Sequence, residues 1–163
     1  MSQGAIVCPT PMVELRQSIQ SRVTEITPFV DRLMRFMAPL FRYFRQDDEQ
    51  EFGVEIAVRE ALANAVIHGN GQDPGKRVHV VCSCTLEGDL LLTVGDEGTG
   101  FEVCALADPT APENLLLDHG RGIRLMQGLM DEVRFEKGGA VVHLFKRLVP
   151  PGRSRRPGEA AHA

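Results

Sequence analysis

The segment from Val54 to Ile67 constrains the fold most strongly, because apolar residues occupy most of its positions on every side of a helix. A helix that is apolar nearly all round must be buried against other elements. Asp47 and Asp48 precede the segment as capping residues, and Gly69-Asn70-Gly71 follows it as a stop signal. We therefore expect a buried helix that runs to His68.

Two polar lines interrupt this helix. At about 100° per residue, Glu55 and Arg59 fall together and can form a solvent-facing ion pair. Glu60, Asn64 and His68 fall on roughly the opposite side. A carboxylate and an amide there need hydrogen-bond partners, a cation or a wet cavity, since burying them unpaired costs free energy. This second line is either a solvated edge of the helix or part of a binding site, and the segment alone leaves both open.

The composition suits one compact domain of 163 residues, 43% of them hydrophobic. The net charge of -4 argues against direct nucleic-acid binding, which needs a basic face. No apolar run reaches the roughly 18 residues of a membrane span, and the start lacks the pattern of a secretory signal, so no membrane association is expected. Cys8, Cys82, Cys84 and Cys104 include no CxxC pair, which predicts reduced thiols in a cytoplasmic protein and no zinc site.

The order of the remaining elements favours an α+β fold. Alternating apolar residues predict strands, and Thr27 before Pro28 predicts an N-cap followed by the first helical residue, with Pro39 as a kink or end. Helices that follow one another between antiparallel strand pairs favour a two-layer α/β sandwich, with helices on one face of a mixed, mostly antiparallel sheet. The predicted strands are 13–19, 78–86, 90–94, 133–135 and 141–148, and the predicted helices are 28–40, 48–68 and 122–130.

The domain itself is expected to span residues 12–149. Residues 1–11 carry two prolines and no periodicity, which predicts a flexible N-terminus. Residues 150–163 are rich in Pro, Gly, Arg and Ala and are expected to be disordered. Residues 102–119 contain two prolines and no clear period, which is typical of a lid or a binding loop in a compact domain.

A first glycine-rich loop, Asp96-Glu97-Gly98-Thr99-Gly100-Phe101, follows the strand 90–94. Asp96 keeps the alternation of that strand, so its carboxylate should project from the apolar face and could accept a hydrogen bond from an amine in a pocket. Gly98 and Gly100 would let the backbone approach a ligand closely. The alternative is an ordinary glycine-rich turn.

A second loop, His119-Gly120-Arg121-Gly122-Ile123, leads into the last predicted helix. The free N–H groups and positive dipole end of a glycine-rich helix start form an anion site, and Arg121 adds a full positive charge. The loop matches neither the Walker motif nor the dinucleotide-binding fingerprint.

Together these three segments resemble the ATPase superfamily of gyrase, Hsp90, histidine kinases and MutL, whose fold is the Bergerat, or histidine-kinase/Hsp90-type, sandwich. Residues 60–65 match its N-box, residues 96–101 its first glycine box and residues 120–123 its second. The resemblance covers about residues 12–148. Within the superfamily, residues 64–69 and 122–133 look most like the anti-sigma-factor serine/threonine kinases.

The resemblance implies ATP and Mg²⁺ as cofactors and gives each box a role. Asn64 would hold Mg²⁺ through its amide oxygen, and Glu60 would be the catalytic base that orients or deprotonates an attacking hydroxyl. Asp96 would accept a hydrogen bond from the adenine amine. The other implied nucleotide-binding residues are Gly98, Gly100, Phe101, Gly120, Arg121, Gly122 and Ile123.

The resemblance also implies partners and a setting. An anti-sigma factor regulates transcription by binding a sigma factor, and the phosphorylated partner would be an anti-anti-sigma factor with a STAS-type domain. Family members often form homodimers. One position departs from the pattern, because Asp118 stands where the family carries an arginine before the second glycine box. Arg121 and Arg124 are the candidates to contact the γ-phosphate instead.

Two other functions compete with the kinase. A regulatory module could bind ATP and sequester its partner without phosphoryl transfer, although such a binder has no need of Glu60 beside the metal. An orphan histidine-kinase catalytic domain is less consistent with the sequence, since we see no phosphoacceptor histidine on a helical hairpin before the N-box.

Overall fold

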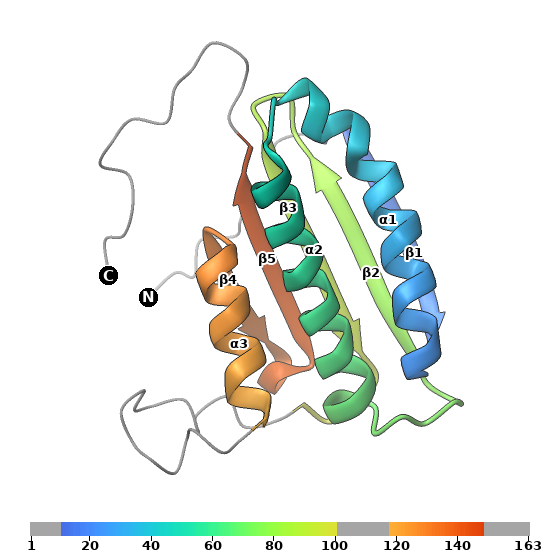
Figure 1. The fold of residues 1–163 in the computed structure, drawn as a ribbon. Helices are drawn as coiled ribbons and strands as arrows, with labels where there is room; N and C mark the ends of the chain where they lie inside the picture. Colours follow the sequence, from blue (N-terminus) through green and yellow to red (C-terminus); the bar gives the residue numbers. More distant parts are fainter. Residues whose placement is uncertain (1–10, 101–117, 149–163) are drawn as a thin grey trace, which may run out of the picture.

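The computed structural model describes residues 11–100 and 118–148, and its helices cover one face of a five-stranded sheet (Figure 1). The strand order is β1-β2-β3-β5-β4, and every pairing is antiparallel. This arrangement confirms the predicted α+β sandwich, although the sheet of the described residues is antiparallel throughout and not mixed. The elements are β1 (Val13–Gln20), α1 (Val23–Tyr43), α2 (Asp48–Ala63), the π-helical turn η1 (Asn64–Gly69), β2 (Arg77–Cys84), β3 (Asp89–Asp96), α3 (Asp118–Leu129), β4 (Glu132–Glu136), the 3-10 turn η4 (Lys137–Gly139) and β5 (Val141–Arg147).

The core lies between the helices and one face of the sheet. On β2 the residues of that face are Val78, Val80, Cys82 and Cys84, all of them buried. Both thiols are free, and burial raises the pKa of Cys82 to about 12 and the pKa of Cys84 to about 11. The two cysteines therefore act as small apolar core residues.

Helix α1 begins earlier than predicted, at Val23, so the expected N-cap at Thr27 is wrong and Pro28 lies inside the helix. Ile26 explains the difference, because it is buried and extends the helical repeat of core residues to a point before the proline. Pro39 does not end the helix either, since buried residues continue at Leu40 and Phe41. Packing of the apolar face overrides the two proline signals.

Helix α2 begins as predicted. The Asp47 side chain accepts a hydrogen bond from the Gln50 N–H, and the Gln50 side chain accepts one from the Asp47 N–H, which completes a capping box. The predicted Glu55–Arg59 ion pair is present at 2.8 Å. Arg59 also reaches Thr27 and Asp31 on α1, so this polar line joins two helices as well as facing solvent.

The predicted flexible start (1–11), lid (102–119) and disordered tail (150–163) fall outside the described residues, apart from their boundary residues at 11, 118 and 119. Within the described ranges, no helix is long and apolar enough to cross a membrane.

Candidate functional site

The site lies where the end of α2, the end of β3 and the start of α3 meet. Gly122 on α3 packs against the polar line of α2, because a Cβ added at Gly122 would lie 2.6 Å from Glu60 Oε2 and 3.7 Å from Asn64 Nδ2. On the other side, a Cβ at Gly98 would overlap the carbonyl oxygen of Gly69. The fold therefore brings together the three segments that the sequence separates.

Asn64 stands at the point where α2 changes into a π-helical turn. The Asn70 N–H donates to the Ala65 carbonyl at 2.8 Å, five residues back, which widens the last turn. Such turns are frequent at functional sites. The Asn64 Nδ2 atom is buried and has no hydrogen-bond partner among the described residues. An orphaned buried N–H donor costs free energy, and an acceptor oxygen from a ligand at this point would remove that cost.

Asp96 closes β3 on the apolar face of the sheet, as the alternation predicted, opposite Val78. Burial raises the pKa of the Asp96 carboxyl, while a hydrogen bond from the Gly98 N–H to Oδ1 at 2.8 Å and the charge of Lys76 act in the other direction. A Cβ at Gly69 would overlap the same carboxylate, so only glycine leaves room for it there.

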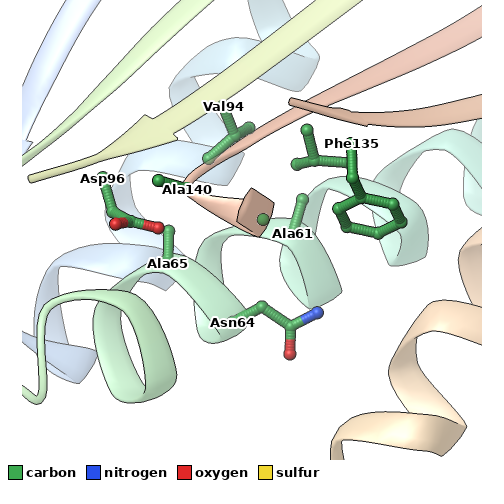
Figure 2. A pocket seen from close by; sticks show the side chains of 9 residues that line it. Ala61, Asn64, Ala65, Val94, Asp96, Phe135 and Ala140 are labelled. Atoms are coloured by element: carbon green, nitrogen blue, oxygen red, sulfur yellow. The ribbon is translucent and has the colours of Figure 1, made fainter. Parts of the chain in front are cut away.

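A pocket joins Asp96 to Asn64 and holds about 230 Å³ of space that is open to solvent. This figure includes open solvent, so it describes a hollow in the surface and not an enclosed cavity. Figure 2 shows Asp96 and Asn64 coming from different elements, with their polar groups pointing in different directions. The lining residues are Ala61, Asn64, Ala65, Val94, Asp96, Phe135, Gly139, Ala140 and Val142.

The far wall of this pocket was missed by sequence reasoning. Phe135 comes from β4, and Ala140 and Val142 come from the hairpin that joins β4 to β5 and from β5 itself. Their only local signal is the apolar alternation of a strand. Their place beside Asp96 depends on the pairing of β5 with β3, which no local pattern encodes.

The second glycine box differs from its prediction, because α3 begins at Asp118 and the box lies within its first two turns rather than before the helix. Gly120 belongs to the first four residues, whose N–H groups lack partners in an α-helix, and Gly122 does not. Close packing of Gly122 on α2 gives this glycine a use inside the helix. Arg121 and Arg124 are exposed, whereas Ile123 is buried in the core.

The remaining predicted site residues are placed less directly. Glu60 is half-buried and its carboxylate faces Gly122, while His68 is exposed at the end of η1. Phe101 lies outside the described residues. Among the described residues, no three His, Cys, Asp or Glu side chains gather in a group that could hold a metal.

Comparison with known proteins assigns the sequence of this chain to a family. Residues 27–146 match the family of histidine kinase-like ATPase domains. The chain is 33% identical over 103 residues to the anti-sigma F factor of Heyndrickxia coagulans, covering 59% of this chain and 69% of that protein. It is 37% identical over 103 residues to that of Bacillus cytotoxicus, covering 58% and 68%.

A solved structure is also similar: the histidine kinase domain of a blue-light-activated kinase from Erythrobacter litoralis, with 25% identity and a TM-score of 0.45. The match covers 61% of this chain and 45% of that one, so the chain spans less than half of the kinase domain structure. The family match extends from α1 to β5 and includes all three boxes. The chain therefore belongs to the histidine kinase-like ATPase family, which confirms the family predicted from the three boxes.

Proposed function

We propose that this protein is an ATP-binding anti-sigma factor and that it phosphorylates a serine or threonine of a STAS-type anti-anti-sigma partner. The observation that carries the proposal is the Glu60–Asn64 pair, with Glu60 near the end of α2, Asn64 one helical turn later at the start of η1, and both facing Gly122 of α3. The similarity to anti-sigma F factors supports the regulatory role.

In this proposal the base of ATP occupies the pocket between Asp96 and Phe135. The Asp96 carboxylate has one oxygen engaged with the Gly98 N–H, which leaves the other to accept a hydrogen bond from the adenine amine. The triphosphate extends toward the start of α3, where the first N–H groups and Arg121 favour an anion.

The residues at the end of α2 also fit a magnesium ion. Mg²⁺ takes oxygen ligands and uses few from the protein, keeping phosphate oxygens and waters for the rest. Asn64 would offer its amide oxygen to the ion, while its unpaired buried atom, the nitrogen Nδ2, is a donor that could serve a phosphate oxygen. Bound there, Mg²⁺ would neutralise phosphate charge and hold the β- and γ-phosphates in one arrangement.

Glu60 would act on the partner's hydroxyl. That oxygen forms a bond to the γ-phosphorus while the bond from the γ-phosphorus to the bridging oxygen breaks, and ADP leaves. The Glu60 carboxylate receives the hydroxyl proton, so the products are a phosphoprotein, ADP and a protonated base. Because Glu60 is one turn from Asn64, it lies beside the phosphates rather than on them.

One observation favours the second candidate, a module that binds ATP and sequesters its partner without transfer. The Glu60 carboxylate packs against Gly122, so it could serve the contact between α2 and α3 instead of catalysis.

A transfer assay separates the two functions. The full chain is incubated with γ-labelled ATP, magnesium and a STAS-type anti-anti-sigma protein that forms a complex with it. We expect label on a serine or threonine of the partner. If ATP binds and a complex forms but no label is transferred, the sequestering module replaces the kinase.

A further inference from the structure

A closed ring of hydrogen bonds lies next to the pocket, outside the residues assigned to it so far. Asn70 is its centre and is buried, with 3% of its surface exposed. Its Nδ2 donates to the Arg77 carbonyl at 2.9 Å, and its Oδ1 accepts from the Glu97 N–H at 2.9 Å. One side chain therefore ties the end of η1 to the start of β2 and to the first glycine box.

The Glu97 side chain completes the ring. Its Oε2 accepts from the Arg77 N–H at 2.9 Å, and its Oε1 lies 3.2 Å from His79 Nε2. The main-chain pairing of β2 with β3 ends at Val78 and Asp96, one residue earlier. At the next position, that of Arg77 and Glu97, hydrogen bonds from the side chains of Asn70 and Glu97 therefore join the two segments in place of strand pairing.

This ring fixes the backbone on both sides of Asp96. The Asp96 N–H donates to the Ala140 carbonyl at 2.9 Å on the β5 side, and the next N–H, that of Glu97, donates to Asn70 on the other side. One residue further, Gly98 packs against Gly69 so closely that no side chain fits between them. Asp96 has little freedom to turn while these contacts hold.

We propose that Asn70 is a positioning residue that sets the direction of the Asp96 carboxylate and, through it, the preference for adenine over guanine. The inference rests on the proposed function, since it takes ATP as the ligand of the pocket. An amide suits the position because it donates and accepts at once, whereas a carboxylate could not donate to the Arg77 carbonyl. Loss of the ring would let Asp96 move without removing any group that touches phosphate.

The experiment compares three ligands, each with magnesium, by calorimetry: ATP, GTP and inorganic triphosphate. For Asn70→Ala we expect the ratio of ATP to GTP affinity to fall about tenfold, while triphosphate affinity stays within about twofold of wild type. Asp73→Ala is the matched control. It lies in the same turn and loses only a hydrogen bond to the Gly75 N–H, so its affinity ratio should equal that of wild type.

Two results overturn the inference alone: an unchanged affinity ratio, or an equal loss for all three ligands, which indicates general damage to the fold. Should Asn70→Ala fail to fold, Glu97→Ala breaks the same ring from an exposed position and must lower the ratio in the same direction. If the wild-type protein binds neither ATP nor GTP, the proposed function itself fails, and the inference falls with it.

Discussion

Substituting Glu60 by glutamine tests the proposed chemistry most directly, because the change removes one charge and keeps the shape of the side chain. Glu60 and Asn64 are four residues apart, so their Cα atoms are about 6 Å apart along the helix. If the carboxylate and a phosphate held at Asn64 have a similar separation of about 6 Å, a unit charge in a water-like dielectric repels a phosphate charge by about 0.7 kcal/mol. Glu60→Gln should therefore bind Mg·ATP about threefold more tightly than wild type.

Phosphoryl transfer should respond in the opposite direction. A positioned general base contributes about 10²–10⁴-fold, so the single-turnover rate with γ-labelled ATP should fall at least about 100-fold in Glu60→Gln. Glu55→Gln is the matched control, because Glu55 lies on the same helix but pairs with Arg59 on the side facing α1. A Glu60→Gln protein that transfers phosphate at the wild-type rate would refute the role of Glu60.

Four further outcomes are expected from the site and the core. Asn64→Ala should remove most of the magnesium dependence of ATP affinity measured by calorimetry, and an unchanged dependence would exclude Asn64 as the metal ligand. Asp96→Asn should lower ATP affinity about tenfold or more, with little change in triphosphate affinity. Because burial raises the pKa of Asp96, its ionised form costs stability at every pH above the ordinary carboxyl pKa, so the same variant should unfold at an equal or higher temperature near pH 7. The thiols of Cys82 and Cys84 should not react with Ellman's reagent in the folded protein near pH 8 and should both react in guanidinium, since burial raises their pKa values.

Local signals predicted the parts of the fold that one segment determines by itself. The capping box at Asp47 and the apolar surface of α2 both depend on residues that are close together in the sequence, and both are present. The prediction for the start of α1 was wrong because two signals in the sequence disagreed. Pro28 favours the first turn of a helix, but burial of Ile26 extends the helix to a point before the proline, and the burial prevailed. Where packing and local preference conflict, the larger buried area decides.

The site likewise has parts that one segment of sequence predicts and parts that depend on the whole fold. The direction of Asp96 followed from alternation along one strand, and the structure places it as expected. The wall formed by Phe135 and Ala140 depends on the order β3-β5-β4, which is a property of the whole sheet. Asn70 showed only a helix-stop signal in the sequence, because its two partners lie at Arg77 and Glu97 and are brought to it by the turn and the sheet.

The glycines of the two boxes show that the presence of a motif does not by itself establish an activity. The sequence assigned Gly98 and Gly122 to close approach of a ligand, yet each also lies where two segments of this chain touch. A side chain at Gly98 would overlap the backbone of Gly69, whereas one at Gly122 would meet the end of the Glu60 side chain, which can move aside. A protein of this fold that had lost phosphoryl transfer would still need Gly98 to pack. Gly122→Ala would press on the Glu60 carboxylate, so loss of activity in that variant could not distinguish ligand contact from a displaced base. Evidence for transfer must therefore come from Glu60→Gln, which keeps the shape of the side chain at the contact with α3 and removes only its charge.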